Sequence, residues 1–148
     1  MKCMGLDLGS RTLGVATSDA LGWIASSLTT IRFEDDDYDT ALEKLLPLIK
    51  EHRIQTIVLG LPKHMNGDIG IRGEISLQFK EMIESQCDVP VVMWDERLTT
   101  VAAQKLLISH DVSRKKRKQI IDQMAAVQIL QGYLDSKKSG ILGQSPVL

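Results

Sequence analysis

The stretch Met4-Gly-Leu-Asp7-Leu-Gly9-Ser-Arg-Thr12-Leu-Gly14-Val-Ala16 decides the fold of this 148-residue chain. Two apolar runs flank a turn that contains glycine, which predicts an antiparallel pair of strands over 1–8 and 13–18. The first run carries one carboxylate, Asp7, and a carboxylate in a strand is costly unless it is paired, hydrogen-bonded or metal-bound. Asp7 is therefore either a turn residue that satisfies local backbone donors or half of a site that a distant segment completes.

The composition, with 43% hydrophobic and 25% charged residues, is that of an ordinary globular protein of one domain. We expect this domain to span 1–138 and a flexible C-terminal tail to span 139–148. Two cysteines are too few for a disulfide framework, so we expect a cytoplasmic protein, with Cys3, Cys87 and Trp23 in its core. No apolar run is long enough to cross a membrane, and we find no signal peptide.

The order of the remaining elements predicts the topology. A third strand over 23–33 precedes a helix over 41–52, which Asp39 or Thr40 can cap and which Pro47 either kinks or shortens. The patterns then predict, in order, a strand over 56–60, a helix over 74–84, a strand over 89–94 and helices over 99–109 and 119–134. Together they indicate a mixed five-stranded α/β sheet, three antiparallel strands followed by parallel ones, flanked by helices.

Four acidic residues lie where such a sheet gathers its ligands. Asp7 ends the first strand, Asp95 and Glu96 end the last parallel strand, and Asp122 lies near the start of the closing helix. Sites in these sheets form at the carboxyl ends of parallel strands, where Asp7 and the Asp95-Glu96 pair could meet. Side chains alternate along a strand, so only one of Asp95 and Glu96 can face Asp7, and the sequence leaves open which.

Converging carboxylates repel one another unless cations neutralise them, and ligation by oxygen alone suits Mg²⁺ or Mn²⁺. Two such ions activate water and stabilise the leaving oxygen in an attack on phosphorus. We therefore take Asp7, Asp122 and the adjacent pair Asp95 and Glu96 as candidate metal ligands. The alternative treats Asp7 as a turn residue, Glu96 as the ion-pair partner of Arg97, and Asp122 as a charge favoured by the helix dipole.

A basic run directly precedes the helix of Asp122. Its five members are Arg114, Lys115, Lys116, Arg117 and Lys118. Bound nucleic acid would lie beside the proposed metal ions, and its affinity would depend on salt because each phosphate contact releases counterions. We expect Arg11 and Arg97 to contact the backbone as well. Aromatic residues make up only 4% of the chain, so we expect base stacking to be minor.

Several segments resemble the YqgF/RuvX family, relatives of the RuvC Holliday-junction resolvase with an RNase H-like fold. The resemblance covers residues 1 to about 134, and it lies in 5–15, 58–62, 65–67, 95–100 and 122–126. It implies a metal-dependent endonuclease with Asp7, Glu96 and Asp122 as its acidic triad. It also implies action on the 5′ end of precursor 16S ribosomal RNA, in contact with pre-ribosomal particles. RuvC relatives place two acids in the closing helix, whereas here Asp122 has only Gln123 and Ala125 nearby.

Three other functions are open to this sequence. A resolvase of four-way DNA would use the same metal chemistry, and would need a homodimer to cut two strands symmetrically, where a monomer suffices for RNA. The Asp7-Leu-Gly9-Ser10 opening also occurs in actin-like and sugar-kinase-like phosphate binders, which need a second domain and a second phosphate loop that this chain lacks. A non-catalytic RNA-binding scaffold is the third alternative.

Overall fold

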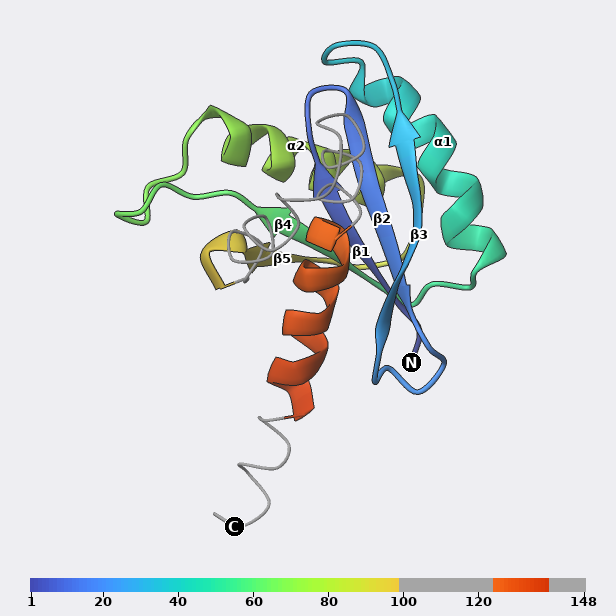
Figure 1. The fold of residues 1–148 in the computed structure, drawn as a ribbon. Helices are drawn as coiled ribbons and strands as arrows, with labels where there is room; N and C mark the ends of the chain where they lie inside the picture. Colours follow the sequence, from blue (N-terminus) through green and yellow to red (C-terminus); the bar gives the residue numbers. More distant parts are fainter. Residues whose placement is uncertain (99–123, 139–148) are drawn as a thin grey trace, which may run out of the picture.

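The computed structural model describes residues 1–98 and 124–138, and its centre is a five-stranded sheet in the order β3-β2-β1-β4-β5 (Figure 1). The strands are β1 (Cys3–Leu8), β2 (Thr12–Ser18), β3 (Ala25–Arg32), β4 (Thr56–Leu61) and β5 (Val91–Asp95). The pairs β1–β2 and β2–β3 are antiparallel, whereas β1–β4 and β4–β5 are parallel. The predicted mixed sheet is therefore confirmed.

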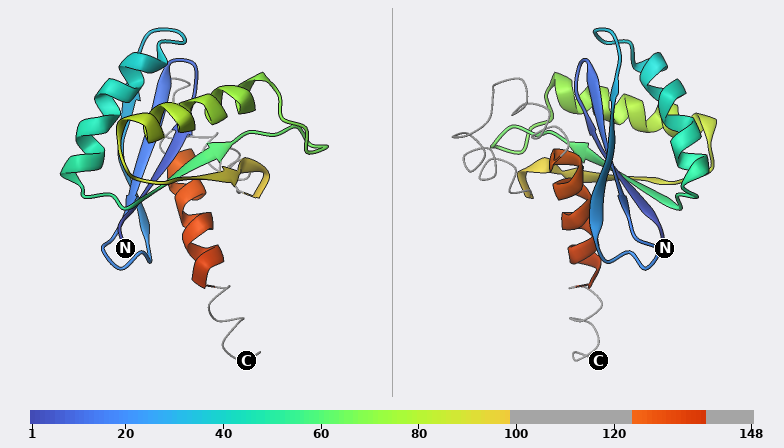
Figure 2. Two further views of the ribbon diagram at one scale, coloured as in Figure 1. Left: turned by 180° about the vertical axis from the view of Figure 1, so that it is seen from behind. Right: turned by 45° about the vertical axis from the view of Figure 1, so that its right-hand side comes forward.

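Helices cover both faces of this sheet. On one face lie α1 (Tyr38–Glu51) and α2 (Ile71–Gln86), and on the other lies a helix formed by residues 124–138 (Figure 2). A short 3₁₀ turn, η1 (Glu96–Leu98), follows β5. No helix within the described ranges combines the length and the apolar composition that crossing a bilayer requires.

Successive side chains of β1 point to opposite faces of the sheet, so this strand contributes to a hydrophobic core on each face. Met4 and Leu6 are fully buried in the larger cluster, beneath α1 and α2. Cys3 belongs to the smaller cluster under helix 124–138, together with Ala126 and Ile129. The helix approaches β1 so closely that a Cβ at Gly5 would lie 2.6 Å from Cβ of Leu130, so only glycine fits there. Asp7, two residues further along β1, lies on this second face.

The ends of α1 and α2 differ from the prediction. Helix α1 begins at Tyr38 because Asp37, not Asp39 or Thr40, is the N-cap, and its carboxylate accepts a hydrogen bond from the Thr40 N–H at 3.3 Å. It runs through Pro47 without ending there. Helix α2 begins at Ile71, three residues earlier than predicted, so part of the expected loop belongs to its first turn.

The expectation that Trp23 is a core residue is wrong, because its side chain is 52% exposed. β3 begins only at Ala25, which leaves Trp23 in the turn after β2, where the carboxylate of Asp19 accepts the Trp23 and Ile24 N–H groups at 2.7 and 2.9 Å. The last helix continues to residue 138 rather than ending at 134. The predicted helix over 99–109, the basic run 114–118, Asp122 and the tail 139–148 lie outside the described residues.

Candidate active site

Glu96 lies over the backbone of β4. A Cβ placed on Gly60 would be 2.5 Å from Oε1 of Glu96 and 2.6 Å from Cδ1 of Ile129. The carboxylate therefore occupies the space that any other residue at position 60 would fill. It also lies on the face of the sheet covered by helix 124–138, to which Ile129 belongs.

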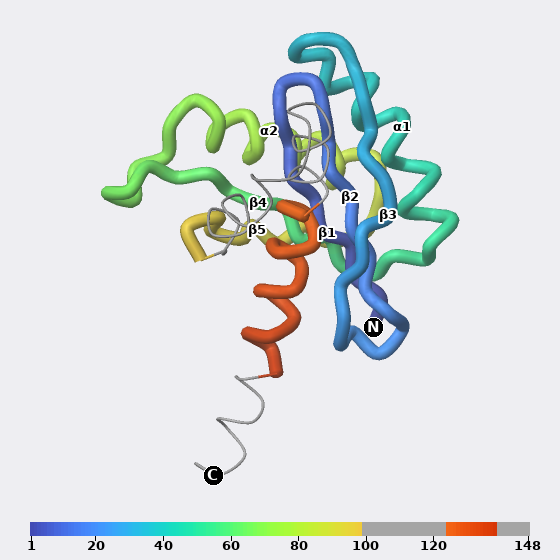
Figure 3. The backbone as a smooth tube through the Cα atoms, viewed as in Figure 1, coloured from blue at the N-terminus to red at the C-terminus, as the bar shows by residue number. Residues whose placement is uncertain are grey.

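Asp7 lies on the same face, one strand away. The parallel register pairs Leu6 with Leu59, and one further step sets Asp7 beside Gly60, whose backbone the Glu96 carboxylate covers. Neighbouring strands are about 4.8 Å apart, so the two acidic residues come to one edge of the sheet from β1 and from the end of β5. The tube in Figure 3 shows β1, β4 and β5 side by side beneath the last helix.

Asp95 is held differently. Its carboxylate accepts hydrogen bonds from Nη2 of Arg97 at 2.7 Å and from the Arg97 backbone N–H at 2.9 Å. Nζ of Lys63 lies 3.9 Å away. The hydrogen bonds from Arg97 are the main cause that holds the pKa of Asp95 below its ordinary value. Val91 and Met93 of β5 pack into the core under α1 and α2, so alternation directs Asp95 to that face, opposite to Asp7.

The two predicted arginines are both engaged in contacts. Arg97 pairs with Asp95 rather than with Glu96, and its Nη1 donates to the Met65 carbonyl oxygen at 3.3 Å, so it ties the loop after β4 to η1. Arg11 forms an exposed ion pair with Asp35, in which its Nη2 donates at 3.0 Å. This pairing is the main cause that lowers the pKa of Asp35.

The described residues supply two of the three predicted catalytic carboxylates. No group of three or more histidine, cysteine, aspartate or glutamate side chains within 1–98 and 124–138 could hold a metal ion. Ala126 and Tyr133 of helix 124–138 are buried against the sheet. Asp122 itself lies outside the described residues.

Sequence reasoning missed a second feature at this edge. A cavity of about 500 Å³ opens beyond the end of β4 and is lined in part by Lys63, His64 and Arg72. Guanidinium Nη2 of Arg72 donates to the carbonyl oxygen of Leu8, the residue after Asp7, at 3.4 Å. The signal in the sequence was the clustering of three basic-type side chains among the glycines of 62–73.

Comparison with known proteins finds similar sequences over nearly the whole chain. A 57% identical protein of Bacillus subtilis (strain 168), over 92% of this chain and 99% of its own, is named "Putative pre-16S rRNA nuclease". A protein of Staphylococcus aureus (strain JH9) with the same name is 54% identical over 91% of this chain and 96% of its own.

Two solved structures share the fold. RuvC of T. thermophilus in complex with a Holliday junction substrate has a TM-score of 0.60 at 13% identity, over 95% of this chain and 96% of its own. The fowlpox virus Holliday junction resolvase has a TM-score of 0.55 at 10% identity, over 92% and 99%. The expected RNase H-like fold is thus confirmed. The model of the RuvX family, described as Holliday junction resolvase, matches residues 1–136, and the chain therefore belongs to this family.

Proposed function

We propose that this protein is a metal-dependent endonuclease that processes the 5′ end of precursor 16S ribosomal RNA. The observation that carries the proposal is the convergence of Asp7 and Glu96 on one face, at the carboxyl edge of the parallel strands. The substrate is taken from the names of the relatives that are 54–57% identical over nearly their whole length. Nucleic acid is the partner that this chemistry requires, on its own or within a pre-ribosomal particle.

The residues present fit a hard divalent cation such as Mg²⁺ or Mn²⁺. The donors are carboxylate oxygens, which these ions prefer, and glycine at position 60 leaves the room that the Glu96 carboxylate takes. Asp7 and Glu96 would hold the cation together with Asp122. When bound, two such ions would supply an activated water and a counter-charge for the leaving oxygen.

Asp95 has a different role in this proposal. Its carboxylate is already neutralised by Arg97 and Lys63, and it points to the opposite face of the sheet. We assign Glu96 rather than Asp95 to the metal, and Asp95 to the positioning of Arg97. Arg97 in turn donates a hydrogen bond to the Met65 carbonyl oxygen and so fixes the loop after β4. In this proposal, Arg97 helps to position the bound strand by holding this loop in place.

The strand itself would be held by positive charge. The basic run 114–118 supplies most of it in the sequence, and Arg11 adds a guanidinium at the turn between β1 and β2. Such contacts go to phosphates, so they position the strand without reading its sequence.

Resolution of four-way DNA is the second candidate, because the family description names it. The same carboxylates would serve, and a homodimer would be needed for two symmetric cuts.

The test compares Asp7→Asn with the wild type in Mn²⁺-dependent cleavage of precursor 16S RNA and of a four-way DNA junction. The control is Asp88→Asn, an exposed residue beyond the end of α2 that removes the same charge. We expect Asp7→Asn to lose cleavage while it still binds the substrate, and Asp88→Asn to cut like the wild type. Cleavage by Asp7→Asn at the wild-type rate would refute the catalytic assignment, and the preferred substrate decides between the two candidates.

A further inference from the structure

The cavity beyond β4 is built by tight packing between a loop and a helix. The loop 62–70 folds back on itself through hydrogen bonds between His64 and Asp68, at 2.9 Å, and between Gly67 and His64, at 2.8 Å. It packs so closely on the first turn of α2 that a Cβ at Gly73 would lie 2.8 Å from the carbonyl oxygen of Pro62. The cavity is therefore a formed feature of the fold.

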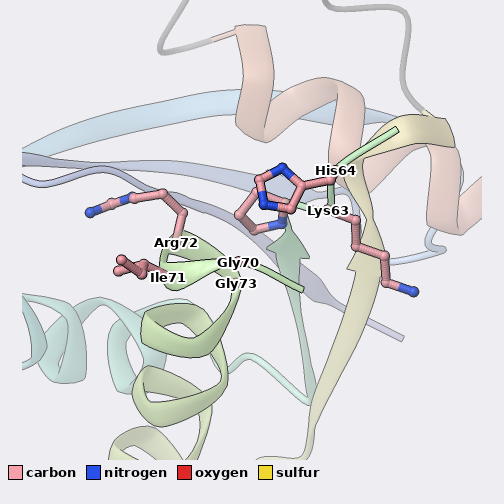
Figure 4. Close-up of a pocket in the computed structure, with 7 residues that line it drawn as sticks. Lys63, His64, Gly70, Ile71, Arg72 and Gly73 are labelled. Carbon is pink, nitrogen blue, oxygen red and sulfur yellow. The ribbon is translucent and has the colours of Figure 1, made fainter. Parts of the chain in front are cut away.

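The surfaces that line the cavity are largely apolar. Pro62 and Ile71 line it, and the imidazole of His64 lies against Gly70, where a Cβ would be 2.6 Å from Nε2. Figure 4 shows the His64 ring above the two glycines. The side chain of Ile71 is 75% exposed and that of Met65 is 92% exposed, so apolar surface continues outside the cavity. An imidazole face with aliphatic neighbours suits a flat ring better than it suits a phosphate.

Positive charge lies on both sides of these surfaces. Figure 4 shows Lys63 and Arg72 extending in opposite directions from the cavity. Lys63 and Arg97 both form ion pairs with the carboxylate of Asp95. Two positive charges therefore face one negative charge, which leaves a net charge of plus one in this group. Within the described part of the chain, Arg72 donates hydrogen bonds to two neutral groups, the Tyr38 hydroxyl and the Leu8 carbonyl. The N-terminus of α2 has no side-chain cap, which leaves its first N–H groups to other acceptors.

We propose that this cavity, the nucleotide pocket (62–73), takes one unpaired nucleotide of the strand that the active site cuts. The base stacks on His64 and Ile71, and the phosphates on either side of it meet Lys63 and Arg72. The pocket lies on the α2 side of the sheet and the carboxylates lie on the other side, and Arg72 donates to the carbonyl oxygen of Leu8, next to Asp7, at the edge between them. A strand that crosses this edge can therefore reach both. The inference rests on the proposed nuclease function, and it adds a site that favours single-stranded substrate beside the cut.

The test measures binding without divalent ions, so that no cleavage occurs. Fluorescence anisotropy follows a short single-stranded RNA, and a DNA of the same sequence, on the full chain. We expect His64→Ala to weaken binding by roughly 5- to 100-fold, as for loss of one stacked base, and His64→Phe to restore it with another flat ring. His52→Ala, at the far end of α1, is the matched control and should bind like the wild type.

An abasic nucleotide moved along the oligonucleotide identifies the stacked base. When the abasic nucleotide takes the place of the stacked base, wild-type binding should weaken. At that position the wild type and His64→Ala should bind equally. Lys63→Gln should lower the slope of log K against log salt by about 0.7, the value for one phosphate of a single strand. Lys50→Gln, an exposed lysine on α1, should leave the slope unchanged.

Two results would overturn the pocket. One is binding by His64→Ala equal to the wild type, and the other is an effect of His64→Ala that no abasic position removes. Neither involves the metal site, so a failure of the Asp7→Asn experiment leaves this test intact. Dependence on His64 with DNA alone would support the pocket and overturn the RNA substrate.

Discussion

The substitution Gly60→Ala tests whether Glu96 binds the divalent cation from its position over β4. The new Cβ would lie 2.5 Å from Oε1 of Glu96, whereas ordinary contact begins at 3.4 Å. The carboxylate must therefore move by about 0.9 Å. The side-chain end of Ile129 in the covering helix must move as well, because its Cδ1 would lie 2.6 Å from the same Cβ.

A displacement of this size is large for a metal ligand. Ligand distances in working sites hold to within about 0.2 Å, so the Gly60→Ala protein should bind Mn²⁺ about 10- to 100-fold more weakly. Overpacking should also lower the free energy of unfolding by about 1–3 kcal/mol. Electron paramagnetic resonance of unbound Mn²⁺ measures the affinity, and urea denaturation without metal measures the stability.

Gly73→Ala provides the control for general strain. Its Cβ would be equally crowded, since it would lie 2.8 Å from the Pro62 carbonyl oxygen, but on the α2 side of the sheet. We expect it to lower stability while Mn²⁺ affinity stays at the wild-type value. Wild-type Mn²⁺ affinity in Gly60→Ala would refute the placement of Glu96 as a ligand over β4.

Two further predictions concern contacts outside the site that stabilise the fold. Gln131→Ala should lower the free energy of unfolding by about 1–2 kcal/mol in urea denaturation, because its Oε1 accepts the part-buried Ala25 N–H at 2.9 Å and so docks the last helix on β3. An unchanged urea midpoint would show that this contact adds nothing. Hydrogen bonds from Thr40 lower the pKa of Asp37, so its contribution to stability is present above the unfolded value of about 3.9 and is lost as pH falls through the folded value. Asp37→Asn should therefore lose less stability than the wild type below about pH 4, and equal acid sensitivity would contradict this.

The sequence predicted every described strand and α-helix, because the periodicity of apolar residues and the glycine turns are local signals, but it did not predict the short 3₁₀ turn η1. It missed the start of α1 by three residues, since several acidic side chains could cap it and only the chain path selects Asp37. It placed Trp23 in the core, because apolar character says nothing of whether a residue falls in a strand or in the turn before it. The cavity at His64 could not be predicted from the sequence, because it exists only when loop 62–70 folds onto α2.

By itself, the amino-acid order determined the mixed sheet and the candidate acids Asp7, Asp95 and Glu96, since strand patterns and strand ends can be read locally. Tertiary structure alone decided which of Asp95 and Glu96 lies on the same face of the sheet as Asp7. Asp95 is drawn to Arg97 and Lys63 on the α2 face, and Glu96 turns back over a glycine on the face of Asp7. Which acid faces Asp7 depends on two features. Side chains alternate along β5 up to its last residue, and Gly60 leaves space for the Glu96 carboxylate. Both features follow from how strands that are distant in the sequence pair in the sheet.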